Sequence, residues 1–252
     1  MGKRFRPRNV KDVVEEIRFL KEHFSLDELE IIDDIFNFNT DRAKKIMEEI
    51  IAEDLNLKIS FPSGIKYEML DDEMLQLFRK AGVYRLAFGI ESANPQIQDK
   101  IGKRVDIPRV TSLIEKATQM GFFTSGFFQL GIPGETKSQM LETIRFALGS
   151  KLHTAMFHFT IPFPGTQMYE ENVKIRGITQ DRFKSAREIS INLSAVSDLD
   201  LIRLKKYAFL KFYFNPARML RIFRTFPDKQ RLFRNFLNVV SEVIFNKWII
   251  PT

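Results

Sequence analysis

The residues of this 252-residue chain whose types could support chemistry gather just after short apolar runs. The pair Asp33–Asp34 ends one run, and Glu91–Ser92 ends a later one. Two glycine-rich segments, Gly131–Thr136 and Pro162–Thr166, follow two further runs. In parallel α/β folds, backbone groups, helix N-termini and loop side chains converge at strand ends and form ligand sites. The pattern therefore predicts a binding site made of carboxylates and glycine-rich backbone.

Each of these segments also has a purely structural interpretation. The pair Asp33–Asp34, together with Asn37 and Thr40, could cap the helix that follows. The glycines around Pro133 could form no more than a turn. Glu91 is harder to explain in this way, because a carboxylate at the inner end of a buried strand needs a partner to offset its desolvation. Glu91 is therefore the strongest single candidate for a functional residue.

Composition limits the metal and thiol chemistry of the chain. It has no cysteine, so it holds neither a disulfide framework nor a thiolate ligand of its own. Its three histidines are scattered: His23 is on the first expected helix, and His153 and His158 lie around the last expected strand. We interpret them as packed or surface imidazoles and not as a metal-binding triad.

The elements that must position these residues alternate regularly. Apolar runs typical of buried strands start near residues 29, 57, 84, 122 and 154, with one amphipathic helix between successive runs. This spacing is typical of βα units in a parallel sheet and predicts an α/β fold. The expected strands are Leu29–Phe36, Leu57–Phe61, Tyr84–Glu91, Phe122–Gly131 and Thr154–Ile161. The expected helices are 10–24 with Asn9 as N-cap, one that Thr40 caps, 71–81, 108–120 and 138–148.

The positive charge of the chain is confined to its C-terminal part. The net charge is +7, yet residues 201–252 alone carry eleven Lys and Arg against two acidic residues. This part also holds eight of the 25 Phe and the single Trp, Trp248. Apolar and basic residues recur at helical intervals from about Asp181 to Trp248, which predicts helices and a second functional region.

Three interpretations could account for this basic, aromatic-rich region. The helices could pack on the open side of the fold with solvated basic faces, or they could attach to an anionic membrane surface. Nucleic acid is the least favoured partner, because no RNA-binding fold accompanies the charge. No apolar run approaches the length of a membrane span and no secretory signal is present, so we expect a cytoplasmic protein that is at most peripheral to a membrane.

Four segments, in this order and at this spacing, resemble one enzyme family. The strings IIDDIF, FGIES, GIPGET and PFPGT are similar to those of radical S-adenosylmethionine (SAM) enzymes, in particular the group that commonly carries an N-terminal cobalamin-binding domain. The resemblance extends from RFRPRNVKDVVEEIRFL to the aromatic-proline-arginine element Phe212–Arg218. It implies a partial TIM-type (βα)6 barrel without its first strand, followed by a helical C-terminal extension. The implied domains are residues 1–175 for strands two to six of the barrel and 176–252 for the basic helical region.

The resemblance also implies which residues surround SAM. The pair Asp33–Asp34 would approach the methionyl amino group, and Glu91–Ser92 the sugar or the methionyl end. The loop Leu130–Glu135 would hold the adenosine through backbone contacts, with its glycines permitting a close approach. The wall near the adenine would be formed by Phe157, Phe159 and Pro162–Thr166. The implied cofactor-binding residues are Asp33, Asp34, Glu91, Ser92, Leu130, Gly131, Pro133, Gly134, Glu135, Phe159 and Pro162.

The chain departs from the family in the cysteines that hold the iron–sulfur cluster. The family motif C-x-x-x-C-x-x-C follows the first strand, and this chain has no cysteine. The resemblance thus implies SAM and a 4Fe–4S cluster whose ligands lie outside this chain, and cobalamin through a missing N-terminal domain. We expect a fragment, inactive alone, of an enzyme that generates a 5′-deoxyadenosyl radical or transfers a methyl group to a small-molecule substrate. The alternative is a cluster-less nucleoside-binding or accessory scaffold protein without catalysis.

Overall fold

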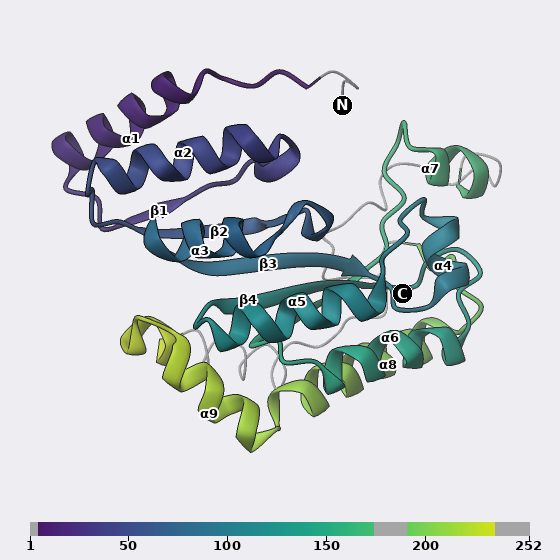
Figure 1. Cartoon of the computed structure of the whole chain (residues 1–252). Coiled ribbons are helices and arrows are strands. Elements are labelled where there is room, and N and C mark those ends of the chain that lie inside the picture. Colours follow the sequence, from purple (N-terminus) through teal and green to yellow (C-terminus); the bar gives the residue numbers. More distant parts are fainter. Residues whose placement is uncertain (1–4, 174–190, 235–252) are drawn as a thin grey trace. The chain divides into compact units, whose positions relative to one another are not determined.

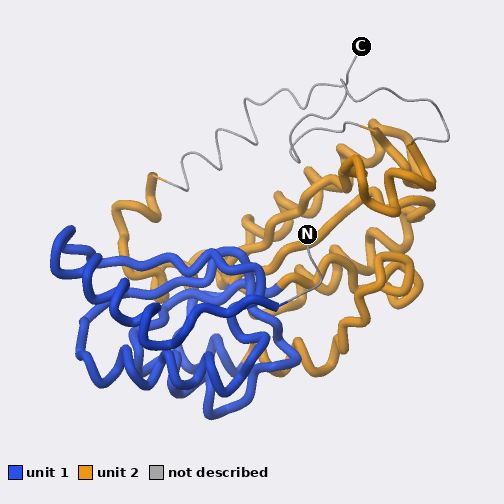
Figure 2. The backbone as a smooth tube through the Cα atoms, turned by 90° about the horizontal axis from the view of Figure 1, so that it is seen from above, with its two compact units in different colours: residues 1–88, 116–124 blue, residues 89–115, 125–252 orange. Residues whose placement is uncertain are grey.

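The computed structural model describes residues 5–173 and 191–234, in which strands and helices alternate (Figure 1). The chain forms two compact units, residues 1–88 with 116–124 and residues 89–115 with 125–252 (Figure 2). From the N-terminus, the elements are α1 (Val10–Phe24), β1 (Glu28–Glu30), η1 (Phe36–Phe38), α2 (Thr40–Ala52), β2 (Lys58–Ile65), η2 (Tyr67–Met69), α3 (Asp72–Lys80) and β3 (Val83–Glu91). They continue with α4 (Pro95–Lys100), α5 (Ile107–Gln119), β4 (Phe123–Leu130), α6 (Lys137–Gly149), β5 (Thr154–Phe159), α7 (Gln167–Asn172), α8 (Asp198–Tyr213) and α9 (Pro216–Thr225).

Parallel pairing organises the strands. β1 pairs with β2, β2 with β3 and β4 with β5, each time in parallel. The strand order β1-β2-β3-β4-β5 is the order of the sequence, and at least one helix connects each strand to the next. Because successive parallel strands need crossover connections, this order confirms the βα alternation predicted from the sequence.

Aromatic side chains form the core of the first unit between β2 and its helices. The rings of Phe36 and Phe78 lie 5.0 and 5.1 Å from the ring of Phe61, measured between centroids. Ile46 and Met47 of α2 are fully buried, as their positions on the apolar face of the predicted helix require. This core keeps β2 and α3 in place behind the strand ends.

The helix caps follow the prediction for α1 but not for α2. Asn9 caps α1, and its side chain accepts the N–H of Lys11 at 3.0 Å. The cap of α2 is Asn39, whose side chain accepts the N–H of Arg42 at 2.9 Å. The prediction of Thr40 as the cap was wrong, because Asn39 has the extended backbone that an N-cap needs and Thr40 is the first helical residue.

β1 is shorter than predicted. The strand expected over Leu29–Phe36 spans only Glu28–Glu30. The pairing with β2 continues as far as the N–H of Ile31, which donates to the carbonyl of Ser60 at 2.9 Å. The next bond of this parallel register would come from the N–H of residue 62, which is Pro62 and has none. The pairing therefore ends, because the neighbouring strand sets the length of β1.

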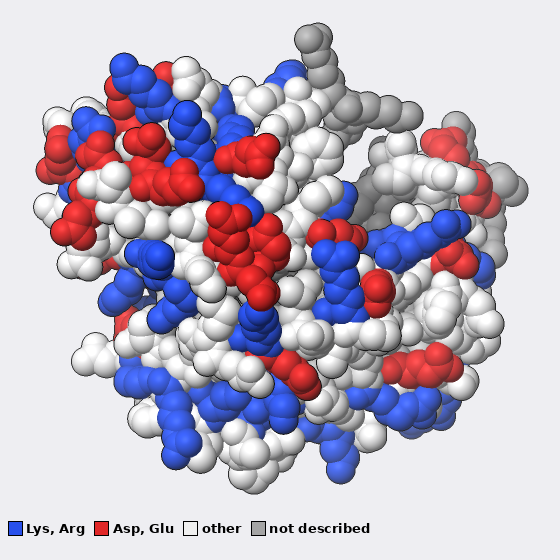
Figure 3. Space-filling view, in the orientation of Figure 1, with Lys and Arg blue, Asp and Glu red and all other residues white. Residues whose placement is uncertain are grey.

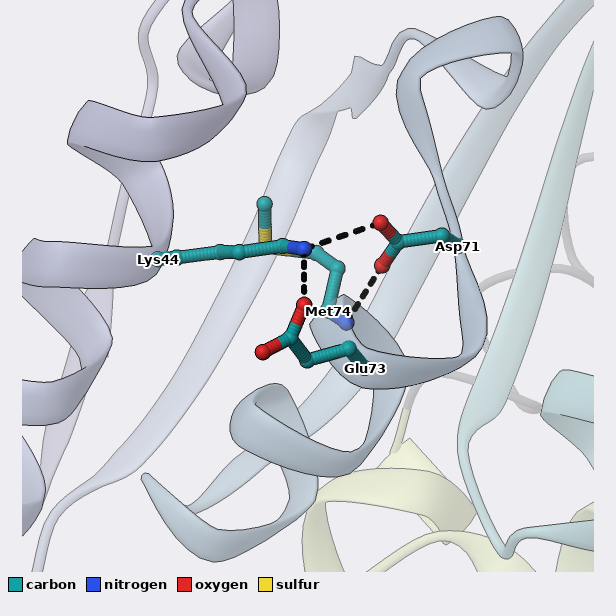
Figure 4. A network of polar contacts seen from close by, with 4 residues as sticks. All are labelled: Lys44, Asp71, Glu73 and Met74. Atoms are coloured by element: carbon teal, nitrogen blue, oxygen red, sulfur yellow. Dashed lines mark hydrogen bonds and ion pairs between the residues drawn. The ribbon is translucent and has the colours of Figure 1, made fainter.

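An ionic network joins α2 to the start of α3 (Figure 4). The ammonium of Lys44 lies 2.9 Å from Asp71 and also pairs with Glu73, and these hydrogen bonds, that to Glu73 first, raise the pKa of Lys44 to about 12. The other oxygen of Asp71 accepts the N–H of Met74 at 2.7 Å and so caps α3. Figure 3 shows acidic and basic side chains intermixed over the region of α1 and α2. Charged side chains of the first unit therefore pair with opposite charges in small groups.

The C-terminal helices α8 and α9 belong to the second unit. They confirm the prediction of helices in the basic region for residues 198–225. The predicted domain boundary at residue 175 and the segment around Trp248 lie outside the described residues. α8 packs against α6 and β5. Each helix in the described ranges is too short or too polar to cross a bilayer.

Arg218 anchors α9 to the rest of the second unit. Its guanidinium group donates to the carbonyls of Leu148, Ser150 and Phe212 at 2.8, 3.0 and 3.2 Å. It also lies 3.5 Å from the ring centroid of Phe212, and Arg218 is only 3% exposed. These carbonyls lie at the C-terminal ends of α6 and α8, where the helix dipole favours a cation. Burial and the nearby Arg221 lower the pKa of Arg218 to about 10, so the group stays charged at neutral pH.

We expect Arg218→Lys to lower the free energy of unfolding by about 2–4 kcal/mol, because one ammonium group cannot reach three carbonyls arranged for a planar guanidinium. Urea unfolding followed by circular dichroism measures this change. The matched control is Arg224→Lys at an exposed position of α9, which should change stability by less than about 0.5 kcal/mol. Equal stabilities of the two variants would show that Arg218 is not the anchor.

Candidate functional site

Glu91, the last residue of β3, has a left-handed backbone conformation with a φ of 63°. Residues other than glycine are uncommon there, and such strained residues concentrate at functional sites. The carboxylate Oε1 lies 3.2 Å from the Nζ of Lys103, and the side chain is 21% exposed. The residue that the sequence favoured most is therefore a partly buried carboxylate that a ligand can reach.

Lys103 reaches Glu91 by crossing the backbone of Gly89. A Cβ added at Gly89 would lie 3.1 Å from the Nζ of Lys103 and 3.5 Å from Oε1 of Glu91. The absence of a side chain at Gly89 therefore leaves the space in which the ion pair forms. Lys103 was not predicted from the sequence, because it lies in the loop between α4 and α5 and no periodic pattern points to it.

Ser92 faces the helices instead of the ion pair. Its buried hydroxyl lies 3.1 Å from the hydroxyl of Thr143 in α6 and accepts the N–H of Asn94 at 3.1 Å. Its carbonyl accepts a hydrogen bond from Nε2 of Gln98 at 2.7 Å. Ser92 thus links β3 to α4 and α6, and its contact with a cofactor stays a prediction.

The loop Gly131–Glu135, which follows β4, is held from the inside by the Glu135 side chain. Oε2 of Glu135 accepts the N–H groups of Gly131 and Ile132 at 2.8 and 3.1 Å. Gly131 and Gly134 have φ values of 89° and 68°, which glycine adopts at little cost. Glu135 is fully buried, so its position makes it the residue that shapes the loop.

Neighbouring segments hold the same loop from the outside. The N–H of Gly134 donates to the carbonyl of Leu193 at 2.7 Å. The Nζ of Lys100 donates to the carbonyl of Pro133 at 2.9 Å. Directly after the loop, Thr136 is the N-cap of α6 and forms a capping box with Gln139. The loop is therefore fixed before any ligand binds.

Leu130, Phe159 and Pro162 are buried. The ammonium of Lys205 in α8 lies 4.0 Å from the ring centroid of Phe159. Leu201, four positions earlier on α8, packs against the glycine loop. Neither residue of α8 was predicted from the sequence, although their spacing places them on one face of a helix. The predicted contacts of Leu130, Phe159 and Pro162 with an adenosine group stay predictions.

Asp33 and Asp34 belong to the first unit. Both are exposed in the segment between β1 and η1, and Ile32 beside them is 73% exposed. The other candidate residues, of which Glu91 is the first and Pro162 the last in the sequence, all belong to the second unit. The aspartates thus follow a strand that ended earlier than expected, and their contact with an ammonium group stays a prediction.

The donor set of this chain does not fit an iron–sulfur cluster. The sequence has no cysteine, and the residues that the structure describes contain no group of three His, Asp or Glu that could hold a metal ion. Burial, together with Arg221 and Arg218, lowers the pKa of His153 to about 3. His153 is therefore a neutral, packed imidazole at physiological pH, as the sequence analysis expected of the histidines.

Burial is also the main cause of the shifted pKa of Glu135. It raises the pKa of Glu135 to about 7, against the opposing effect of the N–H groups of Gly131 and Ile132. Oε1 of Glu135 is buried and has no hydrogen-bond partner among the described residues. A proton on this carboxyl group removes the cost of a buried charge.

We expect wild-type protein to lose stability relative to Glu135→Gln as the pH rises from 4.5 to about 7. The folded-state pKa lies above the unfolded value, so the stabilisation is complete below the unfolded pKa and is lost as the buried carboxyl ionises. The loss should reach roughly 3 kcal/mol. Urea unfolding of both proteins across a pH series measures it, since glutamine keeps an acceptor oxygen but does not titrate. Parallel pH profiles of the two proteins would contradict the assignment.

The chain is similar to known proteins in sequence and in fold. Two curated methyltransferases are 28% identical to this chain: an uncharacterized one of Pyrococcus horikoshii, over 87% of this chain and 48% of its own length, and the cytidylyl-2-hydroxyethylphosphonate methyltransferase of Streptomyces wedmorensis, over 69% and 33%. The chain therefore spans about half, or less, of the curated relatives that it matches.

Among solved structures, the radical SAM methyltransferase TsrM from Kitasatospora setae, with cobalamin and a 4Fe–4S cluster bound, matches with a TM-score of 0.63. The match has 20% identity and covers 69% of this chain and 35% of that chain, so it concerns the fold, a partial TIM-type α/β barrel. A profile of the Radical SAM superfamily, whose enzymes use SAM and a 4Fe–4S cluster, matches residues 1–147. Since this match covers more than half of the sequence and the βα order agrees with it, the chain belongs to the radical SAM superfamily.

Proposed function

We propose that this chain supplies the SAM-binding core of a radical SAM enzyme whose cluster ligands are cysteines outside these 252 residues. The observation that carries the proposal is the strained Glu91, with its partly exposed carboxylate at the end of β3. The loop Gly131–Glu135, which hydrogen bonds hold in place, belongs to the same unit. Membership of the superfamily supports SAM as the ligand.

The residues of the second unit would bind and orient SAM, which supplies a methyl or a 5′-deoxyadenosyl group. The ionised carboxylate of Glu91 would accept hydrogen bonds from ribose hydroxyl groups or from the methionyl ammonium. Lys103 keeps this carboxylate in place. The loop Gly131–Glu135 lacks side chains at two positions, which lets a nucleoside approach its backbone. The pair Asp33–Asp34 is the proposed further partner of the ammonium.

Methyl transfer to a small molecule is the reaction class that we propose. It is supported by the two curated relatives, which are both methyltransferases, and by the fold shared with TsrM. Cobalamin is a proposed cofactor of the whole protein, supported by its presence in the TsrM structure. We place its binding site outside this chain, together with the cysteines.

We expect the chain to bind SAM with a dissociation constant in the high micromolar range or weaker, because hydrogen bonds of about 0.5–3 kcal/mol each act without help from a cluster. Glu91→Gln should weaken binding by about tenfold, since it removes a charge-assisted acceptor. Calorimetric titration of SAM measures both affinities. Glu115→Gln, at an exposed position of α5 in the same unit, is the matched control and should bind like wild type.

Equal affinities of wild type and Glu91→Gln would contradict the placement of the site. Adenosine titrated in the same way separates the two candidate functions. A radical SAM core should bind SAM more tightly than adenosine, because the methionyl part adds contacts. A nucleoside-binding scaffold protein should bind both compounds equally.

We also propose that the C-terminal helices attach to an anionic membrane surface. Phe214, Leu220 and Phe223, in or next to α9, are 79%, 50% and 57% exposed. Lys211 and Arg224 are exposed near them, and the segment from residue 201 onwards is strongly basic. Aromatic and basic side chains together favour the interface of anionic bilayers.

The double substitution Leu220→Ser and Phe223→Ser should reduce sedimentation with phosphatidylglycerol vesicles by about fivefold or more, because two apolar side chains no longer enter the interface. Phe24→Ser, at a 64% exposed position of the first unit, is the control and should sediment like wild type. Equal sedimentation with neutral phosphatidylcholine vesicles, or binding to RNA in their place, would refute the membrane proposal.

A further inference from the structure

Side chains along β4 and β5 alternate between two faces. On one face, the ring of Phe128 lies 6.2 Å from that of Phe146 in α6 and stacks on Phe157 at 5.3 Å. Phe159, two positions after Phe157, lies under Lys205 of α8. The helices α6 and α8 therefore cover this face of the two strands.

The intervening residues point the opposite way, and we call this side the open face: Phe127, Gln129, Met156, His158 and, directly after β5, the buried Thr160. In the parallel register, Phe127 is opposite Met156 and Gln129 is opposite His158. Met156 is 43% exposed, and Phe127, Gln129 and His158 are half-buried. Strands of a parallel sheet normally have both faces covered, so an exposed Met156 within β5 is unusual. The exposure of Met156 shows that solvent reaches this face within β5.

The apolar part of the open face favours a flat ring. The Phe127 ring and the His158 imidazole have centroids 6.4 Å apart, and the thioether of Met156 is opposite Phe127. Aromatic rings and polarisable sulfur both interact favourably with the face or edge of another aromatic ring. These three side chains together therefore suit a conjugated ligand better than an aliphatic one.

The polar part of the open face offers a hydrogen-bond donor. Oε1 of Gln129 accepts the hydroxyl of Thr160 at 3.3 Å. The amide nitrogen of Gln129 has no protein partner within residues 5–173 and 191–234. A half-buried donor without a protein partner suits a ligand that carries an acceptor.

We propose that the open face binds the substrate and that this substrate is a planar conjugated ring with a hydrogen-bond acceptor, a carbonyl or a ring nitrogen, at its edge. Gln129 donates to the acceptor, and Phe127, Met156 and His158 contact the ring. The reaction assigned to this substrate rests on the proposed function. The ligand class rests on the open face alone.

Quinoline, a flat ring with one acceptor nitrogen, is the probe for this site. In a proton–carbon NMR spectrum of histidine-labelled protein only His23, His153 and His158 give imidazole signals. The loss of one signal in each of the variants His23→Gln and His158→Gln assigns the three signals. Quinoline should shift the His158 signal and leave the other two unchanged. An unmoved His158 signal at millimolar quinoline would overturn the proposal.

Two comparisons test the ligand class. Cyclohexanone, which has an acceptor but no aromatic ring, should shift the His158 signal far less than quinoline. Gln129→Leu should weaken quinoline binding by about three- to tenfold, as expected for the loss of one hydrogen bond. Gln119→Leu, at an exposed position outside the open face, is the matched control and should bind like wild type. Equal shifts with both compounds, or unchanged affinity in Gln129→Leu, would overturn the assigned ligand class.

The result of the quinoline experiment does not depend on the result of the SAM titration. A quinoline-induced shift of His158 in a protein that does not bind SAM would support the open-face site and overturn the proposed function. SAM binding that depends on Glu91, combined with an unmoved His158, would support the proposed function and overturn this inference alone.

Discussion

The candidate site depends on one buried carboxylate that binds backbone instead of a cation. One oxygen of Glu135 accepts hydrogen bonds from the N–H groups of Gly131 and Ile132 and so fixes the loop that follows β4. Arg218 is the positively charged counterpart, because its guanidinium group donates to carbonyls at the C-terminal ends of α6 and α8. In both cases partial charges of the backbone stabilise a buried ionisable group. Glu135 thus fixes the loop after the end of β4, and Arg218 fixes the ends of α6 and α8 near the start of β5.

Much of this fold could be predicted because it depends on local patterns. Apolar runs separated by amphipathic helices predicted five parallel strands, and Asn9 was recognised as an N-cap from its type and position. Glu91 was singled out because an acidic residue at the end of a buried strand has few structural explanations. The order of the four motifs pointed to the superfamily that the profile match confirms.

The features that were missed depend on residues far apart in the sequence. β1 ends early because Pro62 on the neighbouring strand lacks an N–H, which no pattern within 29–36 could show. Lys103, Leu201 and Lys205 reach the strand ends from loops and helices that only the folded chain brings there. The face to which Phe159 points could be read from alternation only once the register of β5 was known. Tertiary contacts therefore decide what local patterns leave open.

The ion pair over Gly89 has a consequence for any ligand that binds Glu91. Because the Nζ of Lys103 lies 3.2 Å from Oε1, the resident ammonium already offsets part of the negative charge of the carboxylate. A carboxylate has about four acceptor sites, so a hydroxyl group or a second cation can add to it without removing Lys103. The incoming group then meets a carboxylate that is already partly neutralised, and its affinity reports the charge that the ion pair leaves over and not the strength of an isolated acceptor.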